Sequence, residues 1–247
     1  MRHLRCAALF GAFGLWASGV PGIAVAAPVT AGTSLQVSIN GVDSGSYYSS
    51  SLGCAAGDGN SFSCSGSGLT VGTLTLNSWN MTFDTDPQVS GIVAVTNNSL
   101  NTQQFTLTFT LPVAPIPGSS LTRGSVSGSV TDSANSDTAT VAAPAGSAIY
   151  TSMIDGVLTT QLYPFNASFT APVDISGNVP ATSFGSPVYL PGPGVASSIG
   201  IQLNFTLTPG DSASFTSNHI VVVPEPGPAT MMLLGLGVLA LRRRSAR

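Results

Sequence analysis

Two cysteines are the residues whose type and spacing predict chemistry most directly. Cys54 and Cys64 lie ten positions apart, around the stretch AAGDGNSFS. A metal site would need further ligands close by in the sequence, and a disulfide is the better interpretation. Disulfides persist in oxidising compartments, so this prediction depends on export of the chain. In the chain-entropy model, a closed loop of this size adds about 3 kcal/mol of stability.

Aspartates in two short turns are the candidates for calcium ligands. Asp84 and Asp86 lie in DTDP, and Asp58 and Asn60 lie in GDGN. Calcium takes six to eight oxygen ligands, and its twelve-residue loop pattern is matched by neither stretch. We therefore expect solvated turn acids, and we predict no metal site and no cofactor.

Residues for acid–base or nucleophilic catalysis are sparse. His219 lies in the predicted strand SFTSNHIVVV, where we expect a solvent-facing or hydrogen-bonded side chain. The sequence contains no G-x-S-x-G elbow and no H-E-x-x-H motif. A hydrolase would need two acids converging in a cleft, about 5 to 10 Å apart, and Glu225 is the only glutamate. We therefore expect a non-enzymatic protein.

Alternating apolar and polar residues predict strands through the body of the chain. In QFTLTFTLPV and IGIQLNFTLTPG the apolar residues occupy every second position, as in half-buried strands. SLQVSIN and NASFTAPVDISG repeat the pattern. The predicted buried faces are Phe105, Leu107, Phe109 and Leu111; Ile199, Ile201, Leu203, Phe205 and Leu207; Leu35, Val37 and Ile39; and Phe169, Val173 and Ile175.

Strands separated by Gly, Pro, Ser and Asn predict one antiparallel β-sandwich, Ig-like or jelly-roll-like, over residues 27–222. The apolar phase shifts at Gly72, which predicts a bulge or tight turn there. Two Ser/Gly/Pro-rich stretches, residues 40–68 and 180–198, are expected to be long irregular loops.

The charge distribution excludes one class of partner. The chain has no lysine, and between Pro28 and Leu241 its only basic side chain is Arg123, among ten acids. Nucleic-acid binding needs many Lys/Arg contacts to phosphate, so we predict no nucleic-acid partner.

The N-terminal segment has the layout of a secretory signal peptide. A basic start, an apolar stretch and small residues follow one another in residues 1–26. The sequence Ala24-Val25-Ala26 predicts cleavage after Ala26, with Ala27 as the alternative. We expect an N-terminal signal helix and export of the chain.

The C-terminal segment combines prolines, an apolar run and arginines. Residues 229–241 are uncharged, and as a helix they would reach about 20 Å at ~1.5 Å per residue. We expect a short transmembrane helix, with Arg242, Arg243 and Arg244 as a stop-transfer device at its cytoplasmic end. Pro224, Pro226 and Pro228 predict an extended segment before it.

Residues 223–247 resemble the PEP-CTERM sorting signal of exopolysaccharide-producing Gram-negative bacteria. The resemblance rests on Val223, Pro224, Glu225 and Pro226, followed by the apolar helix and the terminal arginines. It implies recognition by an exosortase-like processing enzyme, a transient inner-membrane intermediate, and delivery to the cell surface or the exterior. The tail is also grouped under an ice-binding-protein label, which implies nothing about ice.

These observations predict a non-catalytic cell-surface or matrix protein associated with extracellular polysaccharide or biofilm. The alternative is a dedicated glycan-, calcium- or ice-binding module. Aromatic residues in the expected loops would support glycan binding, namely Tyr47, Tyr48, Phe184 and Tyr189. Ice binding would need Thr-x-Thr motifs in register, such as Thr106-Leu107-Thr108 and Thr206-Leu207-Thr208.

Overall fold

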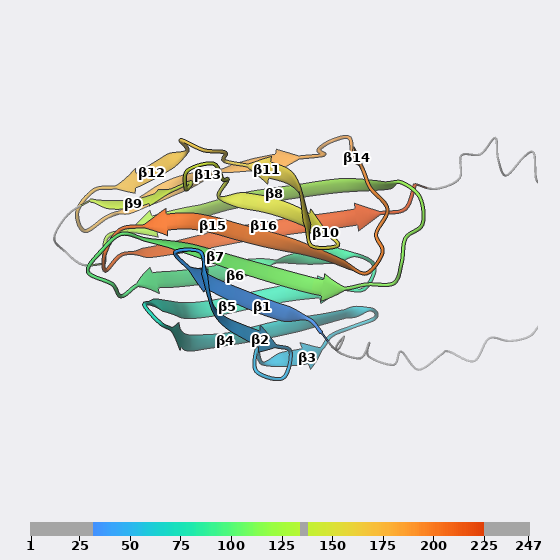
Figure 1. Cartoon of the computed structure of the whole chain (residues 1–247), viewed down its shortest axis with the longest axis horizontal. Helices are drawn as coiled ribbons and strands as arrows, with labels where there is room; N and C mark the ends of the chain where they lie inside the picture. The colour runs from blue at the N-terminus through green and yellow to red at the C-terminus, as the bar shows by residue number, and fades with distance from the viewer. Residues whose placement is uncertain (1–31, 134–137, 225–247) are drawn as a thin grey trace, which may run out of the picture.

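The described part of the chain is all-β. The structure, a computed structural model, describes residues 32–133 and 138–224. These residues form two antiparallel eight-stranded sheets, one in front of the other in Figure 1. Within the described segments, no helix has the length and apolar character needed to cross a bilayer.

Sheet A has the strand order β11-β10-β15-β7-β1-β2, with β9 pairing with β15 and β12 pairing with β9. Its strands are β1 (Ser34–Ile39), β2 (Val42–Tyr48), β7 (Gln103–Pro112), β9 (Ala139–Ala142), β10 (Tyr150–Ile154), β11 (Val157–Leu162), β12 (Ser168–Ala171) and β15 (Ser198–Leu207).

Sheet B has the order β13-β8-β16-β6-β5-β4-β3, with β14 also pairing with β8. Its strands are β3 (Cys54–Ala56), β4 (Ser61–Val71), β5 (Leu74–Asp84), β6 (Gln88–Asn97), β8 (Ser120–Thr131), β13 (Ser176–Phe184), β14 (Leu190–Gly192) and β16 (Ser212–Val222).

The core lies between the sheets, on the faces that the alternation predicts for β7 and β15. Their apolar residues are at most 1% exposed, and Phe105 lies directly opposite Phe205 in the register. Phe205 in turn packs on Phe215 of sheet B, with 4.9 Å between ring centroids. Each such ring removed from water contributes ~1.5–3 kcal/mol, so this aromatic column holds the two sheets together.

The tight turn predicted at Gly72 is confirmed. Val71 pairs with Leu74, so Gly72 and Thr73 form a two-residue hairpin loop, and Gly72 has a φ of 54°. Glycine adopts this left-handed conformation without the steric cost of a Cβ.

Three expectations about strands and loops are wrong. Val173 and Ile175 are 46% and 56% exposed, because the chain turns after β12, where the Ile175 amide donates to the Pro172 carbonyl. The 40–68 stretch forms β2, β3 and most of β4, and the 180–198 stretch holds the end of β13, all of β14 and the start of β15. β2 and β3 lie at sheet edges, and β2 carries no buried residue. Edge strands of this kind need no apolar alternation, so the pattern could not reveal them.

Candidate functional site

Two solvent-open depressions, one on the outer face of each sheet, are the candidate sites. The first, the amide groove, has a volume of about 280 Å³ and is lined by Gln36, Ser38, Gly41, Asp43, Thr106, Thr108 and Gln202. The second, the arginine pocket, has about 270 Å³ and is lined by Arg123, Gly124, Ser125, Ser183, Phe184, Ser186, Asn218 and Ile220. Among these lining residues Asp43 is the only acid, so neither depression contains a pair of carboxylates.

The amide groove is built by two rows that run across neighbouring strands of sheet A. In one row Gln36 of β1 lies opposite Thr108 of β7, which lies opposite Gln202 of β15. In the next row, Thr106 of β7 lies between Ser38 and Asn204. Because alternate residues of a strand share a face, these side chains all point outward from the core.

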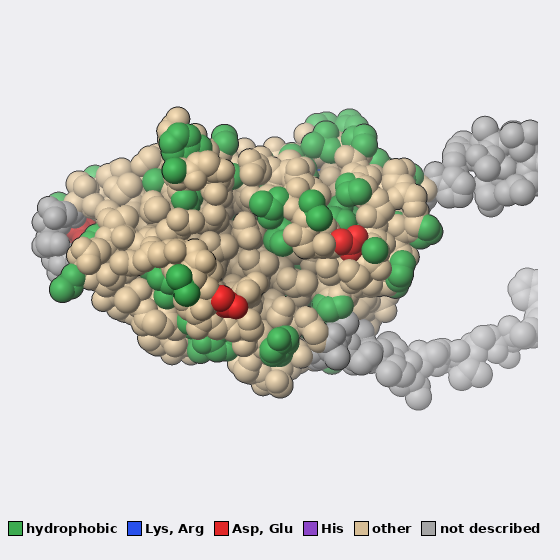
Figure 2. Space-filling view, in the orientation of Figure 1, with side chains coloured by type: hydrophobic (Ala, Val, Ile, Leu, Met, Phe, Trp, Pro, Cys, Tyr) green, Lys and Arg blue, Asp and Glu red, His purple; other side chains and the backbone are tan. Residues whose placement is uncertain are grey.

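Hydrogen bonds between side chains order this outer face. Gln36 Nε2 donates to Asp43 Oδ2 over 3.2 Å, and Gln202 Nε2 donates to Thr108 Oγ1 over 3.4 Å. Asn204 Oδ1 accepts from Gln104 Nε2 over 2.9 Å and from Thr106 Oγ1 over 3.2 Å. The surface therefore presents partly ordered amides and hydroxyls. In the view of Figure 2, the surface is mostly polar and uncharged, with scattered acids.

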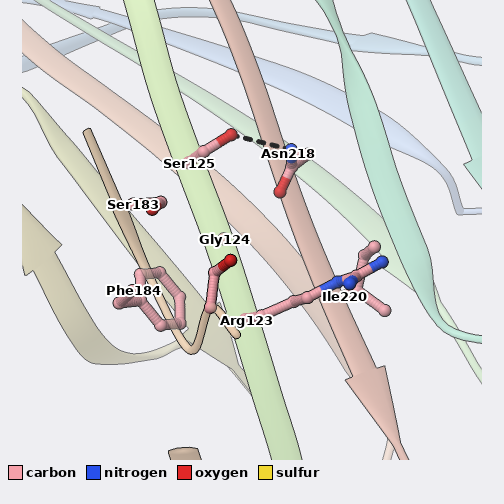
Figure 3. Close-up of a pocket in the computed structure, with 8 residues that line it drawn as sticks. Arg123, Gly124, Ser125, Ser183, Phe184, Asn218 and Ile220 are labelled. Atoms are coloured by element: carbon pink, nitrogen blue, oxygen red, sulfur yellow. Dashed lines mark hydrogen bonds between the residues drawn. The ribbon is translucent and has the colours of Figure 1, made fainter. Parts of the chain in front are cut away.

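The arginine pocket lies on the outer face of sheet B, where β13, β8 and β16 meet. Ser183 of β13 pairs with Ser125 of β8, which pairs with Asn218 of β16. Asn218 Nδ2 donates to Ser125 Oγ over 2.8 Å, as Figure 3 shows. Since Ser125 Oγ accepts this bond, its own hydrogen stays available to a ligand.

Arg123 is the one cation among the described residues. Its guanidinium lies 5.0 Å from the centroid of the Tyr189 ring, and no described acid forms an ion pair with it. Across the sheet Arg123 is followed by Ile220, Gln88 and then Asp84. Three strand spacings of ~4.8 Å separate the backbones of Arg123 and Asp84 by about 14 Å, and Asp86 lies one residue from Pro87, whose carbonyl accepts from the Val221 amide of β16.

Gly124 forms the floor of the arginine pocket. A Cβ built there would lie 2.6 Å from both the Tyr150 hydroxyl and the Phe184 ring. Glycine therefore lets the Tyr150 hydroxyl reach the Asn218 carbonyl, over 2.6 Å. The inner wall of the pocket is tied to the core by this bond.

His219 is confirmed as a hydrogen-bonded residue of a strand, β16. It is fully buried, and its Nδ1 lies 3.1 Å from the Gly200 carbonyl of sheet A. Because a carbonyl oxygen can only accept a hydrogen bond, Nδ1 carries the proton of the neutral imidazole and Nε2 is unprotonated. Nε2 is buried and has no hydrogen-bond partner. Burial lowers the pKa of His219 to about 4, although the bond to Gly200 opposes this shift. Its burial keeps the imidazole from contact with an external substrate.

The two candidate calcium turns are neighbours. The Asn60 carbonyl accepts from the Thr85 amide, which brings GDGN beside DTDP at one end of sheet B. Asp84 Oδ1 accepts from the Asp86 amide over 2.9 Å, as in an Asx turn. Among residues 32–133 and 138–224, no group of three or more His, Cys, Asp or Glu side chains is arranged to hold a metal ion.

The predicted disulfide is present. Cys54 of β3 lies directly opposite Cys64 of β4 in the register, and their sulfur atoms are bonded. The bond closes a hairpin at the edge of sheet B.

The sorting residues lie at the limit of the described chain. Val223 and Pro224 follow β16 and are exposed. Ala26, Glu225, Pro226 and the arginines 242–244 lie outside the described residues.

The predicted aromatic residues do not converge on one site. Tyr47 and Tyr48 lie on β2, and Phe184 is buried at the end of β13, with its ring against the pocket floor. Of the two tyrosines on β2 and Tyr189, only Tyr189 contacts a candidate site, because its ring lies beneath the Arg123 guanidinium. As the one basic residue in the body of the chain, Arg123 could have marked this pocket from the sequence alone. Ser183 and Asn218 could not be added to it, because they come beside Arg123 only through strand pairing.

The threonines of the two Thr-x-Thr motifs are not aligned across β7 and β15. Thr106 lies opposite Asn204, and Thr206 lies opposite Gln104. An amide thus faces a threonine in both positions.

No family model matches the chain, and no curated protein matches it.

Proposed function

We propose that this chain is an exported, non-catalytic protein of the cell surface or extracellular matrix that associates with polysaccharide. The observation that carries the proposal is the outer face of sheet A, where the row Gln36–Thr108–Gln202, with Ser38 and Thr106 beside it, presents amides and hydroxyls. Polysaccharide hydroxyls are neutral donors and acceptors, so such a face can bind them without charged partners.

The spacing of these rows supports contact with an extended ligand. Neighbouring strands lie ~4.8 Å apart, and alternate residues on one strand lie ~6.7 Å apart. Several sugar hydroxyls of one chain can therefore meet successive side chains. Because Gln36–Asp43 and Gln202–Thr108 are already hydrogen-bonded, less side-chain entropy is lost on binding.

Export and sorting belong to the same proposal and rest on the sequence. Residues 1–26 act as a signal peptide cleaved after Ala26, and residues 27–222 form the delivered domain, an Ig-like or jelly-roll-like sandwich. Residues 223–247 anchor the intermediate in the inner membrane until an exosortase-like enzyme acts at Val223–Pro226. The exposure of Val223 and Pro224 beyond β16 supports access by such an enzyme.

Affinity electrophoresis tests polysaccharide association. The full-length protein is run through native gels containing the exopolysaccharide of its own host, and we expect retardation relative to gels without it. The double variant Gln36→Ala/Gln202→Ala should lose most of the retardation. The matched control Asn77→Ala/Asn80→Ala removes two exposed amides from β5 of sheet B and should keep it. Equal migration of the wild-type protein in both gels would refute the proposal.

Mass spectrometry of the protein recovered from the host surface tests sorting. We expect a mature N-terminus at residue 27 or 28 and loss of the C-terminal arginines. A surface form intact through Arg247 would count against processing.

A further inference from the structure

We propose that the arginine pocket binds the carboxylate of an acidic sugar, a hexuronate unit within the polysaccharide. This inference deepens the proposed function and rests on it. Its starting point is the isolation of Arg123, the single cation of the described chain, which no described acid neutralises.

The donors around Arg123 match a carboxylate. The guanidinium presents a planar set of N–H donors suited to two carboxylate oxygens. Ser125 has its hydrogen free because its oxygen accepts from Asn218 Nδ2. Ser183 and Ser186 add two exposed hydroxyls to the lining, and no lining residue is acidic. The pocket is thus rich in donors and carries a positive charge.

The guanidinium is held in place before a ligand arrives. It lies against the Tyr189 ring at 5.0 Å, within the ~6 Å range of a cation–π contact. Tyr189 lies next to Leu190 of β14, which pairs with Thr122 beside Arg123 on β8. A positioned arginine loses less side-chain freedom on binding than a free surface arginine.

The size and apolar part of the pocket fit one sugar ring. Its volume of about 270 Å³ lies just under the ~300 Å³ at which pockets for drug-sized ligands begin. Ile220 contributes an apolar side chain to the lining, against which the C–H face of a pyranose can pack. Asn218 Oδ1 offers an acceptor for a ring hydroxyl. A carboxylated monosaccharide unit meets all of these groups.

The test uses the full-length protein and oligogalacturonate, with its fully methyl-esterified form as the matched neutral ligand. Binding is measured by isothermal titration calorimetry at low salt. We expect the wild-type protein to bind the acid form more tightly than the ester. Arg123→Gln should weaken binding of the acid form roughly tenfold to a hundredfold, the range for losing a charge-assisted hydrogen-bonded pair, and should leave ester binding unchanged.

Three further variants separate recognition from net charge and from misfolding. Arg123→Gln makes the net charge of the protein more negative by one. Asn80→Asp makes the same change in net charge on the same face of sheet B but leaves Arg123 in place, so it should bind the acid form like the wild type. Tyr189→Leu keeps the charge but removes the ring, and should weaken binding severalfold. If Arg123→Gln fails to fold, as judged by circular dichroism, Tyr189→Leu and Arg123→Lys carry the test, and wild-type affinity in both would overturn the inference.

The outcomes distinguish this inference from the function on which it rests. Equal affinity of the wild-type protein for the acid and the ester, or equal weakening by Asn80→Asp and Arg123→Gln, overturns the carboxylate site and leaves polysaccharide association intact. Failure of the wild-type protein to bind either oligosaccharide overturns the carboxylate site, and retardation by the host polysaccharide then decides the proposed function separately.

Discussion

The hydroxyl of Tyr150 donates a hydrogen bond of 2.6 Å to the backbone carbonyl of Asn218, and so joins sheet A to sheet B directly beneath the arginine pocket. Tyr150 is fully buried, and Gly124 leaves the space through which its hydroxyl reaches β16. The bond therefore couples the core to the wall that carries Asn218 and Ser125.

Replacing Tyr150 by phenylalanine removes this bond and little else. We expect Tyr150→Phe to lower the free energy of unfolding by about 1 kcal/mol, the usual net value of a buried neutral hydrogen bond. Urea unfolding followed by tryptophan fluorescence measures the change. Tyr48→Phe is the matched control, because Tyr48 is 56% exposed, and its stability should equal that of the wild type. Equal stability of Tyr150→Phe and the wild type would contradict the expected role of this bond.

The same residue predicts a loss of stability in alkali. Burial raises the pKa of Tyr150 far above the ordinary value near 10. Above pH ~10 the unfolded chain releases this proton while the folded chain retains it, so stability falls with rising pH by up to ~1.4 kcal/mol per pH unit. Urea titrations between pH 9 and about 11 should show a shallower decline in Tyr150→Phe, since the other tyrosines are common to both proteins. Parallel declines would exclude this contribution.

His219 predicts a loss of stability in acid. Its folded pKa, lowered to about 4 by burial, lies below the unfolded value of ~6.5. The neutral imidazole therefore contributes full stability above pH ~6.5, and this contribution is lost as the pH falls toward 4, by about 3 kcal/mol in total. His219→Gln, compared at pH 7.5 and about 4, should lose less stability than the wild type over this interval. An identical decrease in both proteins would show that His219 does not drive the acid response.

The buried side of the sandwich could be predicted from the sequence because a strict two-residue alternation has one interpretation. Phe105 to Leu111 and Ile199 to Leu207 are buried as expected, and a slip of one residue would have turned every one of them to solvent. The prediction for Ile175 was wrong because the same alternation continues through a turn. Asp174 has a φ of 59° there, and the apolar–polar pattern carries no information about this backbone angle. The alternation of apolar and polar residues therefore predicts which face of a strand is buried better than it predicts where the strand ends.

The candidate sites depend on pairing between distant strands, and this is why the sequence did not reveal them. Gln36, Thr108 and Gln202 come from three strands, and nothing in their local sequences states that β1, β7 and β15 are neighbours. Arg123 was conspicuous as a lone cation, yet Ser183 and Asn218 join it only through the order β13-β8-β16. The disulfide was predictable because Cys54 and Cys64 are close in sequence and need only a hairpin to meet.

The Cys54–Cys64 bond predicts stability that depends on the redox state. It ties the edge strand β3 to β4, next to the point where the buried Leu52 carbonyl accepts from Trp79 Nε1 over 3.0 Å. A loop closed across a sequence separation of 10 stabilises the folded state by about 3 kcal/mol in the chain-entropy model. The double variant Cys54→Ala/Cys64→Ala, which adds no polar group at the buried Cys64 position, should lose about this amount in urea unfolding, and proteolysis should begin within residues 49–60. The oxidised wild-type protein should resist both, and adding dithiothreitol should bring it to the stability of the variant. A variant as stable as the oxidised protein would show that β3 is held by its backbone pairing and by the Trp79–Leu52 contact alone.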